Sequence, residues 1–331
     1  MKYKSVVVTK RGGPEVLQIV ENELRPPAAK EARIKVLATG VGRTDINYRY
    51  GLSPFAPNVP FVPGYEIMGV VDAIGAEVTN VAVGDRMAAL IGHGGYSEFI
   101  YLTEEHLVSV PNCLDPAEVV TVVLNYVSAH QMLHRVAKVK KGDTILVNGA
   151  SGGMGTALLE LGKLAGLKMY GTASQSKHHI LEQYGAQAID YQREDFVDVI
   201  HQAEPNGLDF VFEGIGGEQG DRALSVLRHG GKLVAYAAPA GLSSILKDAW
   251  KLARINLLSR TKSAEFYGIT ALYLRDKKPF MEDLPLLFHM LEEDKIKPVI
   301  AAKLPLLEAR KANEMLENGQ VTGNLVLLAS E

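Results

Sequence analysis

The strongest chemical signal in the sequence is a glycine-rich segment near the middle of the chain. Residues 149–155, Gly-Ala-Ser-Gly-Gly-Met-Gly, lie between the apolar run 144–148 and an amphipathic stretch of helical character. A glycine turn in this setting lets the backbone approach a pyrophosphate, whose charge is met by free N–H groups and the positive end of the next helix. The alternative is a turn whose glycines serve close packing alone. The candidate contacts are Ala150, at the first glycine position of G-x-G-x-x-G, with Gly152, Gly153, Met154 and Gly155.

No carboxylate follows this turn where a bare ribose would be bound. A cofactor without a 2′-phosphate is usually held by an Asp or Glu about 20 residues beyond the glycine motif. The segment from Leu161 to Leu181 holds neither, whereas Ser174, Ser176 and Lys177 supply hydroxyls and a cation. This pattern favours NADPH over NADH. The alternative is that Lys177 is a solvated residue that merely opens the next helix.

Two sequence patterns along the chain indicate the secondary-structure elements that position these residues. From Val6 to about Pro111, short β-branched runs separated by Gly and Pro predict an irregular, mainly β domain. After Asp115, a helix N-terminus signal, short apolar runs alternate with stretches of helical length, which is typical of a doubly wound parallel sheet. From Pro298 short runs return around a predicted helix at 307–318, so we expect the C-terminus to rejoin the first domain. The apolar runs of the sheet begin at Thr144, Lys168, Gln187, Leu208 and Lys232.

Length, composition and charge limit the class of protein. At roughly one domain per 150 residues, a chain of 331 residues predicts two domains. A hydrophobic content of 47% and a net charge of −3 are typical of globular proteins and offer no basic footprint for nucleic acid. The single cysteine, Cys113, suits a reducing compartment. No signal peptide or membrane span is predicted, because N-terminal charges interrupt any leader and the apolar run 119–133 is too short for a bilayer. We therefore expect a cytoplasmic protein.

Several segments spread over nearly the whole chain carry a family resemblance. Together they resemble medium-chain dehydrogenase/reductases of the zinc-free quinone oxidoreductase branch, in the order that family has them. The resemblance implies an α/β protein with a GroES-like β domain from residues 1–122 and 299–331, and a six-stranded Rossmann doubly wound parallel sheet from 123–298 that binds NADPH. The segments are Pro63-Gly-Tyr-Glu-Ile-Met-Gly-Val-Val, Val83-Gly-Asp-Arg, Ala150-Ser-Gly-Gly-Met-Gly, Gly171-Thr-Ala-Ser and Thr322-Gly-Asn-Leu-Val-Leu.

The positions that bind zinc in other members of the superfamily hold no zinc ligands in this sequence. Gly42 stands at the position of a cysteine, and Tyr65 replaces the histidine that follows the Pro-Gly turn. Tetrahedral zinc requires three protein ligands with Cys, His or carboxylate chemistry, and Asp45 and Glu66 alone do not supply them. We therefore expect no metal.

The resemblance also implies contacts to the cofactor. Ser128 stands where a threonine approaches the nicotinamide, and Lys177 and Tyr191 stand where the 2′-phosphate is held. Ile215 and Ala237 are assigned to loops after the fifth and sixth strands, near the nicotinamide.

Two asparagines stand where the family has other residues. Asn324 replaces the Lys or Arg of a C-terminal phosphate contact, and Asn47 replaces a tyrosine of many quinone reductases. Neighbouring Tyr48 or Tyr50 could substitute as a substrate contact or could pack in the interior.

The implied reaction is hydride transfer from NADPH to a small hydrophobic quinone or α,β-unsaturated carbonyl. Tyr65 and Asn47 are the candidate catalytic residues beside the nicotinamide, with Gly42 next to them. Tyr65 either polarises the acceptor with its hydroxyl or fills the vacated metal pocket. The alternatives are an enoyl-thioester reductase and a non-enzymatic NADPH-binding sensor or interaction protein.

A homodimer is expected from the segment 262–269. This segment resembles the edge strand through which relatives pair two Rossmann sheets, and an exposed edge is an aggregation hazard unless it is covered. The preceding segment 241–258, which carries Trp250, is interpreted either as a cap over the substrate mouth or as a packed helix.

Overall fold

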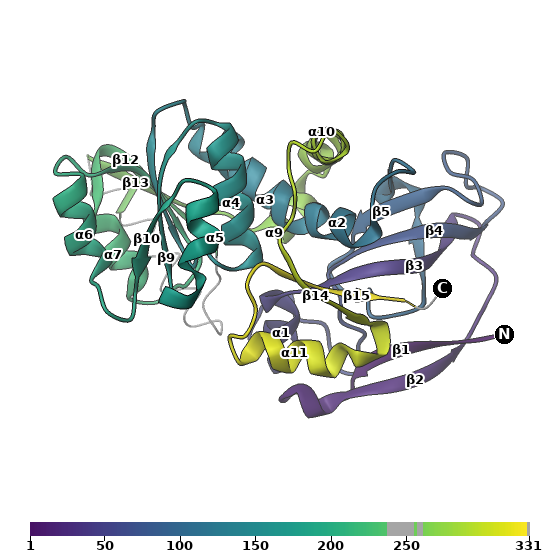
Figure 1. The fold of residues 1–331 in the computed structure, drawn as a ribbon. Helices are drawn as coiled ribbons and strands as arrows, with labels where there is room; N and C mark the ends of the chain where they lie inside the picture. The colour runs from purple at the N-terminus through teal and green to yellow at the C-terminus, as the bar shows by residue number, and fades with distance from the viewer. Residues whose placement is uncertain (237–254, 257–260, 330–331) are drawn as a thin grey trace. The chain divides into compact units, whose positions relative to one another are not determined.

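The computed structural model describes residues 1–236, 255–256 and 261–329 (Figure 1). The chain forms two compact units, which are Met1–Val127 with Lys277–Glu331, and Ser128–Asp276. The sequence predicted an interrupted first domain of this kind, with boundaries after residues 122 and 298. In the structure, helix α10 (Lys278–Glu292) packs against η3 (Val122–Tyr126), and both elements belong to the first unit.

A seven-stranded sheet forms the framework of the first unit, in the order β14-β15-β3-β4-β5-β7 with β6 paired to β3. Residues on β3 alternate between buried and partly exposed, so that Ala32, Ile34 and Val36 share one face and pack against Ile67 and Val71. β15 pairs with β3, which confirms that the C-terminus rejoins the N-terminal domain. The strands are β3 (Glu31–Val41), β4 (Glu66–Ile74), β5 (Arg86–Leu90), β6 (Phe99–Thr103), β7 (Val108–Ser109), β14 (Ile300–Pro305) and β15 (Asn324–Leu328).

Smaller elements complete the first unit. A two-stranded sheet joins β1 (Lys2–Val8) to β2 (Leu17–Glu23). The helices are α1 (Arg43–Tyr50), α2 (Pro116–Thr121) and α11 (Ala309–Glu317), with short turns η1 (Pro14–Val16), η2 (Glu104–His106) and η6 (Leu306–Glu308).

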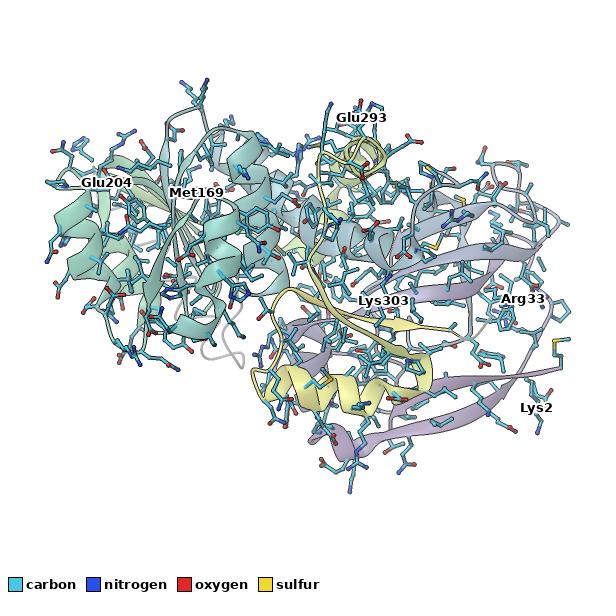
Figure 2. The ribbon with its side chains drawn as sticks, in the orientation of Figure 1. Lys2, Arg33, Met169, Glu204, Glu293 and Lys303 are labelled. Carbon is cyan, nitrogen blue, oxygen red and sulfur yellow. The ribbon has the colours of Figure 1, made fainter. Side chains whose placement is uncertain are left out.

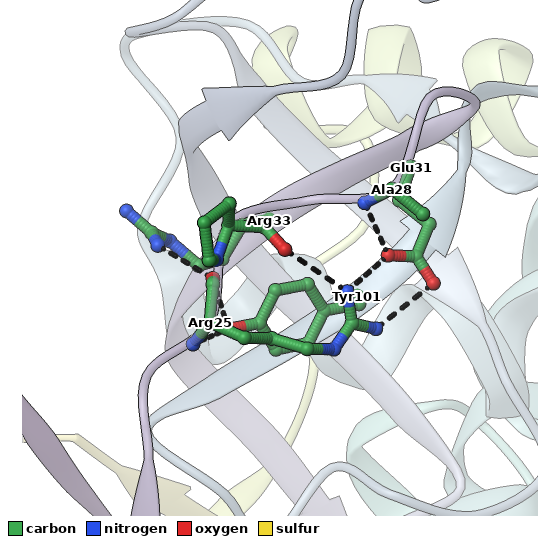
Figure 3. Close-up of polar contacts among 6 residues, drawn as sticks. Arg25, Ala28, Glu31, Arg33 and Tyr101 are labelled. Atoms are coloured by element: carbon green, nitrogen blue, oxygen red, sulfur yellow. Dashed lines mark hydrogen bonds and ion pairs between the residues drawn. The ribbon is translucent and has the colours of Figure 1, made fainter.

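A polar cluster fixes the connection that leads from β2 into β3 (Figure 3). The Arg25 guanidinium lies 3.9 Å from the centroid of the Tyr101 ring and donates to both Glu31 carboxylate oxygens at 2.6 and 3.0 Å. Arg33 donates to the Arg25 carbonyl at 3.0 Å. The hydrogen bonds from Arg25 and from the Ala28 N–H lower the pKa of Glu31. Stacking and ion pairing therefore hold this connection where it has few apolar contacts.

A six-stranded parallel sheet forms the second unit, in the order β10-β9-β8-β11-β12-β13. This arrangement confirms the predicted doubly wound sheet, and each predicted apolar run is a strand. Ile215 follows the fourth strand along the chain and Ala237 the fifth, so the assignment of their loops to the fifth and sixth strands was wrong by one. The strands are β8 (Thr144–Asn148), β9 (Lys168–Ala173), β10 (Gln187–Asp190), β11 (Leu208–Glu213), β12 (Leu227–Ala235) and β13 (Lys262–Phe266).

Helices follow most of these strands, as a wound sheet requires. The core of the unit includes Leu146, Tyr170 and Ile189 of the sheet and Ile200 of a helix. The helices are α4 (Gly153–Leu164), α5 (His178–Gln183), α6 (Phe196–Ala203), α7 (Gln219–Ser225) and α9 (Ile269–Arg275), with η5 (Gln175–Lys177) before α5.

A run of helical elements follows the predicted N-terminus signal at Asp115. The Asp115 carboxylate accepts from the N–H groups of Ala117 at 2.8 Å and Glu118 at 3.2 Å, which caps α2. After η3 the chain continues through α3 (Val127–His130) and η4 (Gln131–Ala137). None of the helices in the described part of the chain has the length and hydrophobicity needed to cross a membrane.

Exposed charges of both signs cover the surface (Figure 2). Lys2 pairs with Glu21 at 3.3 Å, and Lys303 pairs with Asp115 at 3.2 Å. The apolar Met169, by contrast, is buried in the second unit. Exposed pairs of this kind contribute little to stability, so the apolar interiors carry the fold.

Candidate cofactor site and buried polar clusters

The glycine-rich turn connects β8 to α4 in a conformation that needs glycine. Gly149 has a φ of +77°, and a Cβ on Gly155 would lie 2.5 Å from the Gly149 carbonyl oxygen. Gly152 is the N-cap of α4 and supplies no side chain to cap its first turn. The N–H groups of that turn are therefore left for another hydrogen-bond acceptor. Because the glycines carry no Cβ, the backbone here forms an open cradle, and such a cradle fits a pyrophosphate.

The departure from the G-x-G-x-x-G pattern has a structural reason. Ala150 is fully buried, and its N–H donates to the Thr172 carbonyl at 3.0 Å. A Cβ on Gly171 of β9 would lie only 2.8 Å from the Ala150 Cβ. The methyl group of Ala150 therefore fits because the facing position on β9 has no side chain.

Most of the predicted cofactor contacts in the second unit lie at one edge of its sheet. Because the strands are parallel, the loops after β8, β9, β10 and β11 all leave from their carboxyl ends, and the strand order changes direction between β8 and β11. Dinucleotides bind at such an edge in open parallel sheets. The residues brought to this edge are Ala150, Gly152, Gly153, Met154 and Gly155 after β8, Ser174 and Lys177 after β9, Tyr191 after β10 and Ile215 after β11.

The loop after β9 presents the predicted phosphate-binding groups. The Lys177 N–H donates to the Ser174 carbonyl at 2.9 Å, which closes the turn η5. The Ser174 and Ser176 hydroxyl oxygens lie 3.4 Å apart. Lys177 is half-buried, and this partial burial lowers its pKa. After β10, Tyr191 is 59% exposed. A partly dehydrated ammonium group attracts a phosphate more strongly than a fully hydrated one does.

The loop after β11 lies against the glycine-rich turn. A Cβ on Gly149 would lie 3.0 Å from the Ile215 Cδ1 atom. The buried Glu213 carboxylate accepts from the N–H groups of Ile215 and Gly216, and also from the Asn148 side chain at the end of β8. Sequence analysis missed this link. The available signal was a polar residue closing two otherwise apolar runs, Ile-Leu-Val-Asn148 and Phe-Val-Phe-Glu213.

Two further predicted contacts belong to the second unit. The Ser128 side chain on α3 is 1% exposed, and its hydroxyl oxygen has no hydrogen-bond partner among the described residues. An orphaned buried hydroxyl of this kind fits a site that a bound group completes. Ala237 lies outside the described residues, as do Trp250 and most of the segment 241–258.

In the first unit, Asp45 joins the two places where zinc relatives carry ligands. Its carboxylate accepts from the Gly42 N–H and from the Gly64 N–H, each at 2.9 Å. Gly42 begins α1, and Gly64 precedes Tyr65, so one side chain fixes both segments. The Tyr65 carbonyl oxygen in turn accepts from the Ile91 N–H at 3.0 Å. Gly42 and Tyr65 are thus held in one cluster, and their place beside the nicotinamide stays a prediction.

Tyr65 is a buried side chain paired with Tyr48. The two ring centroids are 6.0 Å apart, and the hydroxyl groups of Tyr65 and Tyr48 are hydrogen bonded to each other. Burial, followed by the proximity of Tyr48, raises the pKa of Tyr65. Tyr65 is therefore neutral at physiological pH, and its hydroxyl can donate or accept a hydrogen bond. Tyr50, by contrast, is 41% exposed and lies under the Arg49 guanidinium.

Beneath Tyr65, two carboxyl groups are buried together. Burial raises the pKa of Asp45 to about 6, although its backbone donors oppose the shift. Burial and the proximity of Asp45 raise the pKa of Glu66 well above its usual value. The Glu66 Oε2 atom has no hydrogen-bond partner among the described residues. Asp45 accepts two backbone hydrogen bonds and Glu66 has an unpaired oxygen, so Asp45 is the member of the pair better able to hold a negative charge.

The two candidate asparagines, Asn47 and Asn324, differ in burial and in the hydrogen bonds of their side chains. Asn47 lies half-buried on α1, one residue before Tyr48. Asn324 is buried at the start of β15, where it donates to the Val299 carbonyl at 2.9 Å and accepts from Asn125 at 2.6 Å. Its amide is thus hydrogen bonded within its own unit, and its contact with a cofactor stays a prediction.

Within the described ranges, no group of three or more His, Cys, Asp or Glu side chains is placed to hold a metal ion.

Comparison with known proteins gives matches along nearly the whole chain. Residues 28–112 match the alcohol dehydrogenase GroES-like domain, and residues 184–327 match a model described as zinc-binding dehydrogenase. A quinone oxidoreductase of Pseudomonas aeruginosa is 31% identical over 325 residues, which cover 96% of this chain and 97% of that protein.

Two solved structures share the fold at full length. A quinone oxidoreductase of Escherichia coli complexed with NADPH is 25% identical with a TM-score of 0.89, and the match covers 98% of this chain and 99% of that one. A mycobacterial protein complexed with NADPH is 27% identical with a TM-score of 0.87 and the same coverage, 98% and 99%.

Proposed function

Because the chain belongs to the quinone oxidoreductase family of medium-chain dehydrogenase/reductases, we propose that it is an NADPH-dependent reductase of a quinone or an α,β-unsaturated carbonyl. The observation that supports NADPH as the cofactor is the backbone cradle at Gly149 and Gly155. Lys177 follows it at the place where a carboxylate would select NADH. Both similar solved structures hold NADPH.

The second unit would bind the cofactor through groups of distinct chemistry. The amides of the glycine-rich turn would meet the pyrophosphate, and Ser174, Lys177 and Tyr191 would meet the 2′-phosphate. The orphaned hydroxyl of Ser128 and the apolar side chain of Ile215 would contact the nicotinamide end. When bound, the reduced nicotinamide supplies a hydride.

The first unit would bind and polarise the acceptor. Tyr65 stays protonated, so its hydroxyl can donate to the oxygen of a carbonyl or quinone, and the half-buried Asn47 offers a second amide donor. Burial and the proximity of Asp45 raise the pKa of Glu66, so a further negative charge beside this pair of carboxyl groups is unfavourable, which favours an uncharged acceptor over a carboxylate-bearing one.

The proposed reaction needs no metal ion. One matching family model is described as zinc-binding, but Gly42 and Tyr65 offer neither the thiolate nor the imidazole that a tetrahedral zinc site takes. We also propose a homodimer, because β13 is the edge strand of its sheet and Phe266 on it is 45% exposed.

The test is NADPH oxidation measured in parallel with 1,2-naphthoquinone, a short alkenal and crotonyl-CoA. We expect turnover of the first two acceptors, and Tyr65→Phe should lower it by roughly 10²-fold if the hydroxyl polarises the acceptor. Tyr101→Phe is the matched control, because Tyr101 belongs to the polar cluster with Arg25, outside the predicted substrate and cofactor contacts, and should leave turnover unchanged. Turnover of crotonyl-CoA alone would indicate an enoyl-thioester reductase. Tight NADPH binding without turnover of any acceptor would indicate a sensor.

A further inference from the structure

Glu213 is a buried carboxylate at the carboxyl end of β11 whose partners all come from the cofactor edge of the sheet. Its side chain is 2% exposed. One oxygen accepts from the Ile215 N–H at 2.6 Å and from the Gly216 N–H at 3.0 Å. The other accepts from the side-chain amide of Asn148. A single side chain therefore contacts both the loop after β11 and the end of β8.

The hydrogen bonds around Asn148 run in one direction, towards Glu213. The Gly149 N–H donates to the Thr172 hydroxyl oxygen at 3.0 Å, and that hydroxyl donates to the Asn148 side-chain oxygen at 3.3 Å. The Asn148 NH₂ group then donates to Glu213. A carboxylate only accepts, so it fixes the orientation of the asparagine amide and hence of the whole chain of donors.

The loop that Glu213 holds is rich in glycine. Gly216 and Gly217 have φ values of +83° and +65°, and no atom of the described residues lies within 4 Å of a Cβ placed on either. Glycines in open space lose the most conformational freedom on ordering. The side chain of Ile215 nevertheless lies against Gly149. The two amide hydrogen bonds to Glu213 add a polar link from this loop to Asn148 at the end of β8, which leads into the glycine-rich turn.

We propose that Glu213 is a positioning residue that holds the loop 214–217 against the glycine-rich turn and so preforms the cofactor site. This inference rests on the proposed function, since it takes the site to be that of NADPH. The side chain acts through the Ile215 and Gly216 amides and through Asn148. A loop ordered before binding removes an entropic cost from cofactor association.

The experiment exchanges the acceptor and the donor between two positions. In Glu213→Gln, two NH₂ groups face each other at Asn148, so one hydrogen bond is lost without a change of shape. In the double variant Asn148→Asp/Glu213→Gln, the glutamine NH₂ group donates to the new carboxylate. The Thr172 hydroxyl and the Ile215 and Gly216 amides keep their acceptors. The pair of variants therefore separates hydrogen-bond direction from side-chain volume.

Two readouts are taken on all three proteins. Amide hydrogen exchange of residues 214–217, measured without cofactor, reports whether the loop is ordered. Fluorescence titration with NADPH reports the dissociation constant. We expect Glu213→Gln to speed exchange at Ile215 and Gly216 and to weaken NADPH binding about tenfold, as loss of one buried hydrogen bond predicts. The double variant should return both values to within about threefold of the original protein.

The outcomes separate this inference from the proposed function. Unchanged exchange and unchanged NADPH affinity in Glu213→Gln would overturn the positioning role alone. A double variant no better than the single one, or one that does not fold although its donors and acceptors match, would do the same. If the original protein binds no NADPH at all, the proposed function and the cofactor role of Glu213 both fail. Should Glu213→Gln itself not fold, a folded double variant with slow exchange supports the inference.

Discussion

Replacing Lys177 by glutamate reverses the charge at the predicted 2′-phosphate contact. Lys177 ends η5 directly after β9, and the segment 161–181 provides no acidic residue that could select NADH. We expect the Lys177→Glu variant to bind NADPH more weakly than the original protein does. Its affinity for NADH should equal that of the original protein. The reason is that only NADPH carries a phosphate at this position.

The size of the effect follows from the environment of the lysine. A charge-assisted hydrogen bond contributes roughly 1.5 to 3 kcal/mol, which corresponds to roughly 10- to 150-fold in affinity. Lys177 is only half-buried, and salt screens the exposed part of the interaction, so the lower end of that range applies at physiological ionic strength. We therefore expect a loss of at least about tenfold for NADPH, increasing as salt is lowered.

The assay is titration of NADPH and NADH against the original protein and two variants. Lys163→Glu on α4 is the matched control, because Lys163 is exposed and donates to the Gln183 carbonyl, outside the predicted phosphate contacts. It makes the same change in net charge and should alter neither affinity by more than about twofold. Equal affinity of the original protein for the two cofactors would refute the assignment. An equal loss in both variants would show that only the net charge matters.

Three further outcomes are expected. Elemental analysis should find no stoichiometric zinc, and a chelator should leave NADPH oxidation unchanged; one zinc per chain lost together with activity would contradict this. Light scattering at micromolar concentration should give twice the chain mass of 35.9 kDa, whereas a monomer would remove the role proposed for β13. The pKa of Asp45 is raised to about 6 by burial, so the folded state holds this proton more tightly than the unfolded state does. Its contribution therefore lowers the free energy of unfolding as pH rises from about 4 to 6, by about 3 kcal/mol. Chemical denaturation across this range should show that loss relative to Asp45→Asn, and parallel pH profiles would refute it.

Much of the fold was predictable because its signals are local. Five of the six strands of the parallel sheet contain apolar runs such as Thr144–Asn148, and Asp115 before a proline marks a helix N-terminus by its capping chemistry. The glycine-rich turn combines a tight turn, an uncapped helix and a strand within one short segment. A single sequence is sufficient for features whose cause lies within a few residues.

The buried polar networks were not predictable, because their partners are far apart in the chain. Glu213 and Asn148 meet only when β11 pairs with β8 in the observed register. Asp45 and Glu66 come together only when α1 and the turn at Gly64 are joined by hydrogen bonds. Composition and periodicity indicate which residues are buried, but they do not indicate which buried polar groups satisfy each other.

The alanine at the first glycine position shows how the two kinds of information combine. From the sequence motif alone, Ala150 is a departure from the first glycine of the dinucleotide-binding pattern, because a Cβ at that position normally meets neighbouring backbone. The structure shows that Gly171 on the adjacent strand leaves room for it, and that the Ala150 N–H still donates to the Thr172 carbonyl. The motif therefore does not require glycine at that position as such. It requires that the summed volume of two facing positions, one in the turn after β8 and one on β9, stay small enough for the turn to close, and in this chain the small partner lies on β9.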